Sequence, residues 1–403
     1  MSVIRLLAAA GFVTVSACES GGEMSGTVVT DSAGVRIVTH PPGPRDTLPL
    51  VEPLLTIGRE GDPLYEFSTI RYVGALSDGR VVVADRGSFQ IRHYSVDGTF
   101  LSAYGRAGDG PGEFRSFDHV QLIAGDTLSV NDARLGRISF ISAEPAVAYS
   151  LSYASAFEGM PKKDGMWCQG PTYQGLTAGR RLVFLGWGCW SGEGTEGVRD
   201  VFAELRLWNP ASGEQRATSP VRWASVYENP ALPESQRFTP LPLFGYGYVH
   251  PHPQGVLVSV PNAYEVRSLA ADGSLVQVIR ERIPRRPFDD EMRAREAAEL
   301  AEAPEAVRRR IERIPFPDSL SSFDRLFVGD GQIWARHDPR GGGDDAFFWS
   351  VYALSGEVLG LVQVPRSFNL FSVSRGMTFG VERNELGIER VQVRPVPFGG
   401  APP

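Results

Sequence analysis

Short stretches in which apolar and polar residues alternate recur along the chain, separated by turns rich in glycine and aspartate. Residues 79–85 end in one such turn, and residues 90–95 are followed by the Asp97-Gly98 pair. Alternation with a period of two is typical of half-buried strands, and Asp-Gly is a favoured hairpin turn. The pattern therefore predicts short antiparallel strands joined by tight turns.

The strand pattern belongs to a repeat. Residues 58–67 and 105–114 share Gly, Arg, Gly, Asp, Glu and Phe at matching positions, without a gap. Strand pairs follow these two copies, and more divergent strand pairs recur at residues 181–208, 255–269, 331–354 and 377–394. Repeats of about forty to fifty residues with four short strands are typical of propeller blades. We therefore predict an all-β fold, a single six-bladed β-propeller over residues 30–397.

The sixth copy ends without an outer strand, whereas residues 34–39 form a lone strand before the first repeat. Propellers commonly close by pairing an N-terminal strand with the last blade, which leaves no unprotected edge. We therefore expect residues 34–39 to complete the sixth blade.

One segment departs from the β pattern. Residues 288–314 are charged and rich in alanine, and acidic residues stand near their start. Acidic residues favour a helix N-terminus, so the segment predicts a helical insertion between the fourth and fifth blades. It serves either as surface decoration or as a lid or partner-docking element.

The first residues have the pattern of an export signal. Arg5 is the only charged side chain before residue 19, and residues 6–17 are apolar or small, a run too short to span a bilayer. The run ends in Val-Ser-Ala-Cys, which resembles the bacterial lipobox. We expect residues 1–17 to be removed and Cys18 to carry a lipid; an ordinary secretory signal with a chance cysteine is the alternative. Residues 18–29 would form a flexible tether, and residues 398–403 a C-terminal tail.

Two further cysteines, Cys168 and Cys189, follow in the exported part of the chain. Export places them in an oxidising compartment, where a disulfide is the expected state. Two cysteines alone provide too few ligands for a metal site. We therefore predict a Cys168–Cys189 disulfide that stabilises the fold by about 3 kcal/mol.

The formal net charge of −7 limits the partners. Nucleic-acid binding and a polybasic membrane surface both depend on clustered positive charge, so this composition argues against both. Membrane attachment would then depend on the lipid anchor alone, at the cell membrane or the outer membrane, with the domain facing the periplasm or the exterior. We expect the protein to be a monomer.

Part of the repeat resembles NHL-type repeats of the six-bladed propeller superfamily, which includes TolB-like domains. The resemblance rests on the two Gly-Arg copies and on Val83, Asp85, Ile91, Tyr94 and the Asp97-Gly98 turn, and it is strongest over residues 54–143. The chain is also similar to bacterial six-bladed propeller lipoproteins of unassigned function, which share the lipobox, the short N-terminal strand and the helical insertion. The resemblance implies the fold and the location, but no reaction.

Four residues are candidate metal ligands. His250 and His252 would face one side of a strand, although a metal site needs at least a third ligand, and both also suit a loop. Asp85 and Asp132 end matching strands, where carboxylates commonly fix a turn. In lactonase-like propellers such acids hold a metal at the channel mouth. Ca²⁺ or Zn²⁺ is the cofactor that these residues would bind.

Aromatic residues concentrate in the middle of the sequence. Trp187 and Trp190 flank Cys189 in a loop rich in glycine and tryptophan, at residues 186–197. Aromatic side chains fill the contacts between blades and also form ligand surfaces, and loops on rigid scaffolds often carry function. These two tryptophans are our candidate binding residues.

Two functional hypotheses follow. The first is a non-enzymatic binding or scaffold protein of the cell envelope, with an envelope protein, a peptide or a glycan as its partner. The second is a metal-dependent hydrolase or lyase, as in lactonases and amidating lyases. We favour the first, because the sequence contains none of the nucleophile, metal or phosphate motifs searched for and identifies no catalytic residue.

Overall fold

The computed structural model describes residues 26–398, except 44, 145, 153–166, 170–171, 178–179, 187, 191–193, 234–235, 253, 306, 309–311, 339 and 341–344. The predicted signal peptide, Cys18 and most of the tether lie outside the described residues. The described part consists mainly of β-strands, together with α1 (Asp290–Ala301) and the short 3-10 helix η3 (Pro242–Phe244). The prediction of an all-β fold is confirmed.

Five sheets contain a meander of four antiparallel strands in chain order. The first comprises β5 (Ile70–Ala75), β6 (Val81–Asp85), β7 (Gln90–Tyr94) and β8 (Phe100–Tyr104). The second comprises β11 (His119–Ile123), β12 (Thr127–Asp132), β13 (Arg137–Ile141) and β14 (Val147–Ser152). The third comprises β16 (Thr172–Leu176), β17 (Leu182–Leu185), β20 (Leu205–Trp208) and β21 (Gln215–Ala217).

The remaining sheets follow the same plan. The fourth comprises β24 (Val249–His252), β25 (Gly255–Ser259), β26 (Glu265–Ala270) and β27 (Leu275–Glu281). The fifth comprises β28 (Phe323–Gly329), β29 (Gln332–His337), β30 (Ala346–Ala353) and β31 (Val358–Pro365). The sixth comprises β32 (Phe368–Ser374), β33 (Met377–Arg383), β34 (Glu389–Pro395) and, from the beginning of the chain, β4 (Leu55–Ile57).

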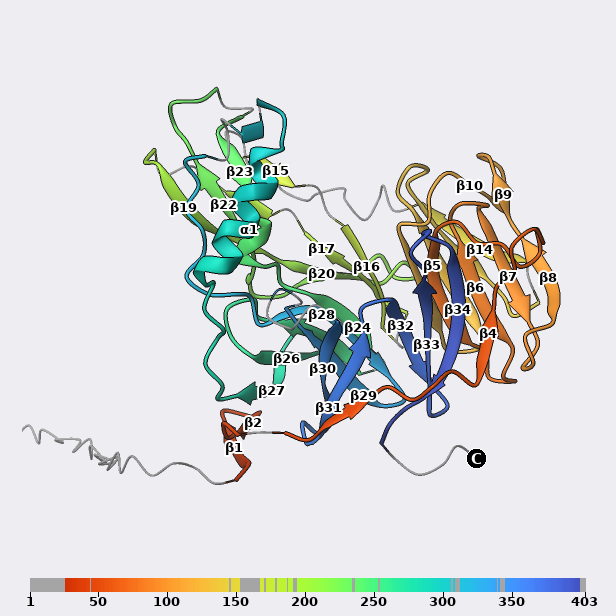
Figure 1. Ribbon diagram of the computed structural model, residues 1–403. Helices are drawn as coiled ribbons and strands as arrows, with labels where there is room; N and C mark the ends of the chain where they lie inside the picture. The colour runs from red at the N-terminus through yellow and green to blue at the C-terminus, as the bar shows by residue number, and fades with distance from the viewer. Residues whose placement is uncertain are drawn as a thin grey trace, which may run out of the picture.

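The first strands of these sheets, which we call the inner strands, follow one another in a closed order. Each contacts the next in the series β5, β11, β16, β24, β28, β32 and again β5. Figure 1 shows the first sheet at one side of the molecule and the fourth and fifth sheets at the other. Apolar side chains fill the space between neighbouring sheets; Val82 and Ile91 of the first, for example, share a cluster with Leu128 and Val130 of the second.

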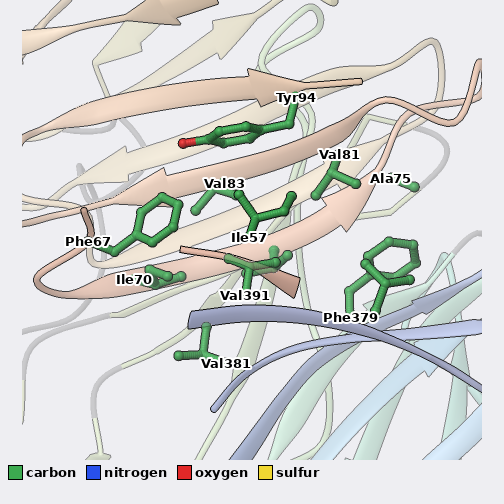
Figure 2. Packing of buried hydrophobic residues seen from close by; sticks show 12 residues of the cluster. Ile57, Phe67, Ile70, Ala75, Val81, Val83, Tyr94, Phe379, Val381 and Val391 are labelled. Atoms are coloured by element: carbon green, nitrogen blue, oxygen red, sulfur yellow. The ribbon is translucent and has the colours of Figure 1, made fainter. Parts of the chain in front are cut away.

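The contact between the sixth and first sheets closes this order. Ile57 and Val391 of the sixth sheet lie in one cluster with Val83 and Tyr94 of the first (Figure 2). Ser372 on β32 also donates a hydrogen bond to the carbonyl of Val73 on β5 at 2.7 Å. The sixth and first sheets, which lie far apart in the sequence, therefore pack against each other through a shared apolar cluster, as sheets that follow each other in the sequence do.

The strand that completes the sixth sheet differs from the predicted one. β2 (Val35–His40) pairs in parallel with β27 of the fourth sheet and forms a hairpin with β1 (Val28–Ser32). Two of its side chains fit there: Val38 is buried, and the His40 ring bonds the Gly356 carbonyl at 2.8 Å. β2 therefore extends the fourth sheet, and the prediction that residues 34–39 complete the last blade is wrong.

The segment after β2 continues along the outer edges of the next sheets. β3 (Thr47–Pro49) pairs in parallel with β31 of the fifth sheet. β4 then pairs with β34, so the N-terminal segment passes three successive sheets before the first repeat begins. A small parallel pair, β9 (Arg106–Ala107) and β10 (Glu113–Phe114), connects the first two sheets.

A separate group of elements lies outside the inner strands, and we call it the cap. It comprises β15 (Trp167–Gln169), β18 (Gly188–Trp190), β19 (Gly197–Ala203), β22 (Val221–Glu228), β23 (Phe238–Pro240) and α1. Figure 1 shows α1 beside β19, β22 and β23. In the chain, its strands lie before, within and after the third sheet, and α1 lies between the fourth and fifth sheets.

The helix forms within the segment predicted to be helical. Asp289 is its N-cap, and the carboxylate accepts a hydrogen bond from the Met292 amide at 2.9 Å. Met292 is buried and packs with Phe288 and Leu320, which fixes the helix to the segment before the fifth sheet. The rest of the segment predicted to be helical, residues 304–314, is only partly described.

Candidate functional site

The inner strands surround a cavity of about 860 Å³, which we call the channel. Cavities of about 300–1,000 Å³ commonly accommodate small ligands. Each inner strand contributes at least one polar side chain to the wall: Arg71, His119, Gln174, His250, Arg325 and Asn369. Side chains that lie far apart in the sequence therefore meet in one space.

Three histidines line the channel. His250 and His252 stand on β24, as predicted for one face of a strand, and His119 stands on β11. Burial lowers the pKa of His119 and of His252 to about 4. Burial, and then the neighbouring His119, lowers the pKa of His250 to about 3. All three imidazoles are therefore neutral at pH 7.

Two ring nitrogens of these histidines lie just behind the channel surface, without a partner in the part of the chain that the structure describes. Nδ1 of His119 and Nε2 of His252 are buried and have no hydrogen-bond partner among the described residues. The His119 ring packs edge-on against Tyr173, with 5.4 Å between ring centres. A neutral imidazole can donate or accept a hydrogen bond, so the channel wall offers polar groups that are not already occupied.

One end of the channel, which we call the arginine end, lies between the fifth and sixth sheets. Arg336 binds the Asp324 carboxylate through two hydrogen bonds of 2.7 Å, and Arg383 is paired with Glu389. A second cavity of about 410 Å³ adjoins the channel here and shares Arg336 and Arg383 with its wall. Arg325, between these pairs, has the Asn369 amide oxygen as its hydrogen-bond acceptor, at 2.7 Å.

The opposite end, the turn end, is fixed by contacts between hairpins. Asp330 accepts hydrogen bonds from the backbone of Arg375 and Gly376, at 2.8 and 2.6 Å. Arg375 in turn donates to the carbonyl of Ser77 at 2.6 Å. Asp330 and Arg375 both have positive φ, as two-residue hairpin turns require. These contacts join the fifth, sixth and first sheets around the turn end.

The channel histidines do not have the arrangement of a metal site. Within the described part of the chain, no group of three or more His, Cys, Asp or Glu side chains is placed to hold a metal ion. The histidines face one cavity from two strands, but their ring nitrogens do not converge on a shared point. They are better suited to hydrogen bonding with a ligand than to metal binding.

Asp85 and Asp132 lie at the ends of β6 and β12, away from the channel wall. Asp85 is buried and accepts hydrogen bonds from the Thr69 and Gly87 amides, both at 3.1 Å, and from Ser88. Asp132 is also buried and accepts from the Arg115 amide at 2.7 Å and from other donors of its turn. Both carboxylates are thus engaged in fixing the connections before and after their strands.

The other sequence candidates lie in the cap. Cys168 and Cys189 are directly opposite each other in the antiparallel pair β15–β18, and Trp190 is opposite Trp167. The side chains of this pair, and all of Trp187, are outside the described residues. Opposite residues of an antiparallel pair have Cα atoms about 4.5–5.5 Å apart, a separation that a disulfide can span.

His119 and Arg325 are channel residues that the sequence analysis missed. The repeat contains a signal for His119, because the offset that aligns residues 58–67 with 105–114 also aligns Tyr72 with His119. Both side chains line the channel. Arg325 lies in a divergent copy of the repeat that cannot be aligned in this way. Its place in the channel wall follows only from the position of β28 among the inner strands.

Known proteins resemble the chain in structure only. The sequence matches no protein-family model, and no curated protein matches it. A protein described as exported, from Bacteroides fragilis, is 8% identical, with 86% of this chain and 96% of that chain covered and a TM-score of 0.47. An inactive variant of virginiamycin B lyase from Staphylococcus aureus is 9% identical, with 85% of this chain and 98% of that chain covered and a TM-score of 0.37. A streptogramin B lyase is 10% identical, with 87% of this chain and 96% of that chain covered and a TM-score of 0.35. Identities this low carry no information about a shared ligand or reaction.

No described helix is long and apolar enough to cross a membrane.

Proposed function

We propose that the chain is an exported six-bladed β-propeller that binds a ligand in its channel without transforming it. The six four-stranded sheets and the closed order of their inner strands support the propeller. A propeller gathers one or two side chains from each blade around its axis, so one scaffold can present many combinations of polar groups. We place the protein at the cell envelope, as a monomer whose ligand is a peptide, a glycan or part of an envelope protein.

The channel carries this proposal. Its volume of about 860 Å³ and its polar wall, with neutral imidazoles, amides and guanidinium groups, suit hydrogen bonding to a ligand of moderate size. Gln174 lines the wall, and its side-chain amide donates to Thr172 of its own strand and to no other described residue. A ligand in the channel would therefore contact Gln174 without displacing an interaction between sheets.

The ligand can be sought by crosslinking from inside the channel. A photo-reactive amino acid at position 174, in the full chain in its own envelope, would capture whatever occupies the channel. The same group at Arg134, an exposed turn residue outside the wall, is the matched control. We expect a product that is specific to position 174. Identical product patterns from the two positions would contradict ligand binding in the channel.

A metal-dependent hydrolase or lyase is the second candidate, because three neutral imidazoles line one cavity, even though they are not arranged as a metal site among the described residues. Neutral imidazole is the form of histidine that binds Zn²⁺. The purified protein, residues 20–403, would be assayed for bound metal, and its melting temperature compared with EDTA and with added Ca²⁺ or Zn²⁺. Stoichiometric metal and a melting temperature several degrees lower in EDTA would favour this candidate over the binding protein.

We also propose that Cys18 carries the lipid that holds the protein at the membrane. The Val-Ser-Ala-Cys sequence that ends at Cys18 supports this. Replacement of Cys18 by alanine is expected to move the protein from the membrane fraction to the soluble fraction. Mass spectrometry of the wild-type N-terminal peptide should show the acyl mass on Cys18, and an unmodified cysteine would contradict the anchor.

A further inference from the structure

Arg325 differs from the other arginines at the arginine end in its partners. Arg336 is paired with Asp324, and Arg383 with Glu389. Arg325 donates to the neutral amide of Asn369, and its guanidinium lies 5.5 Å from the centre of the Phe371 ring. Among the residues that the structure describes, no carboxylate forms an ion pair with Arg325.

The surroundings of Arg325 favour a negatively charged group beside it. Burial, and then the positive charge of Arg336, lowers the pKa of Arg325 to about 10, which still leaves the guanidinium charged at neutral pH. The Arg325 side chain is half-buried in the channel wall, and a partly desolvated charge is stabilised by pairing or hydrogen bonding. The Asp324 carboxylate offsets part of this cost, but both of its oxygens are bound by Arg336.

The neighbouring histidines add donors to the same region. His250 and Arg325 line the same cavity from the adjacent inner strands β24 and β28. A ligand beside Arg325 could therefore also accept a hydrogen bond from a neutral imidazole N–H.

We propose that Arg325 binds an anionic group of the channel ligand, a carboxylate or a phosphate. A guanidinium has five N–H donors in a planar fork, and Asn369 takes one of them. The remaining donors can bind two oxygens of one anion, an arrangement that is stronger and more specific than a single contact. This inference rests on the proposed function, because it assigns a chemical class to the ligand of the same channel.

Acetate and inorganic phosphate serve as probes for the proposed anion site. The melting temperature of the purified protein would be followed while sodium acetate or inorganic phosphate replaces chloride at constant ionic strength. The variants are Arg325→Gln, which removes the charge, and Arg325→Lys, which keeps the charge but not the fork. Arg134→Gln removes the same charge from an exposed turn and is the control.

We expect at least one anion to raise the melting temperature of the wild type and of Arg134→Gln with the same half-maximal concentration. That concentration should be about tenfold or more higher in Arg325→Gln, and intermediate in Arg325→Lys. A response to acetate alone would assign a carboxylate, and a response to phosphate alone a phosphate. Equal half-maximal concentrations in the wild type and in both Arg325 variants would overturn the proposal.

Gln174→Trp separates this proposal from the proposed function, because a bulky side chain there should narrow the channel away from Arg325. A captured ligand that is lost in Gln174→Trp but binds Arg325→Gln normally would overturn the anion site and leave channel binding intact. If no ligand is captured, the acetate and phosphate titrations still test Arg325 by themselves.

Discussion

Ile57 of β4 lies opposite Val391 of β34, so a strand from the beginning of the chain provides the outer strand of the last sheet. Ile57 is 2% exposed and belongs to the cluster that joins the sixth sheet to the first. We expect Ile57→Ala to lower the free energy of unfolding by about 2–4 kcal/mol, through lost burial and an unfilled cavity.

Urea unfolding would measure this loss. Leu54, in the same segment, is 66% exposed, so Leu54→Ala should change the free energy of unfolding by less than about 0.5 kcal/mol. Equal effects of the two substitutions would contradict the role of β4 in closing the order of sheets.

The channel histidines should make the fold sensitive to acid. Burial lowers the pKa of His252 from 6.5 to about 4, so between these values the unfolded chain binds a proton that the folded chain does not. Stability therefore rises with pH across this window and is lost as the pH falls below about 6.5. Thermal unfolding of His252→Gln should show a loss between pH 7 and pH 4 that is smaller by about 1–2 kcal/mol, allowing for solvent in the channel.

Ligand binding should depend on pH in the opposite sense. An anion beside Arg325 would raise the pKa of His250, whose titratable and charged neighbours are His119, His252 and Arg325. Burial holds this pKa at about 3 without the anion, so a bound anion would favour proton uptake, and the affinity for phosphate should increase as the pH falls below about 5. His250→Gln should remove most of this increase in a titration, whereas a slope unchanged in that variant would exclude His250 as its source.

Reduction of the proposed disulfide should destabilise the cap. Cys168 and Cys189 are register partners and would close a loop of about twenty residues, for which the chain-entropy model gives about 3 kcal/mol. The Cys168→Ser, Cys189→Ser double variant should therefore melt at a lower temperature than the oxidised protein, and reductant should not lower it further. Two free thiols in the protein as isolated would show that the pair does not form.

A buried carboxylate joins the N-terminal segment to the fourth and fifth sheets. Glu281 on β27 accepts a hydrogen bond from Arg45 at 2.7 Å and another from the hydroxyl of Tyr352 on β30. Glu281→Gln should lower the free energy of unfolding by about 2–4 kcal/mol, because Arg45 loses its partner in a buried site. Glu204→Gln, which breaks an exposed pair with Arg206, should cost less than about 1 kcal/mol in the same denaturant titration.

The repeat allowed much of the fold to be predicted, because strand periodicity and turn residues are local signals. The hairpins around Asp97-Gly98 and the helix after Asp289 illustrate this. The closing strand was assigned wrongly because β4 has only three residues, and its pairing depends on where β2 and β3 direct the chain. Sequence periodicity contains no information about which of several outer edges a short strand will join.

The candidate site was less predictable, for a related reason. His250 and His252 were found from their own spacing, and both line the channel. Asp85 and Asp132 looked equally suitable, but backbone donors of adjacent segments occupy their carboxylates. Arg325 has no local signal, because its character comes from Asn369, Phe371 and Arg336 on neighbouring strands and sheets.

The pairing of β4 with β34 also determines when folding of the sixth sheet can be completed during synthesis. A chain made from its N-terminus completes β4 long before its partner strand β34. Until then one sheet lacks a strand, and such non-local pairing is slow to form. An unpaired edge can join another chain, although Pro53, two residues before β4, hinders this because it lacks an N–H donor. The time between the synthesis of β4 and its pairing with β34 is therefore the period in which an unpaired strand edge can cause aggregation of the nascent protein.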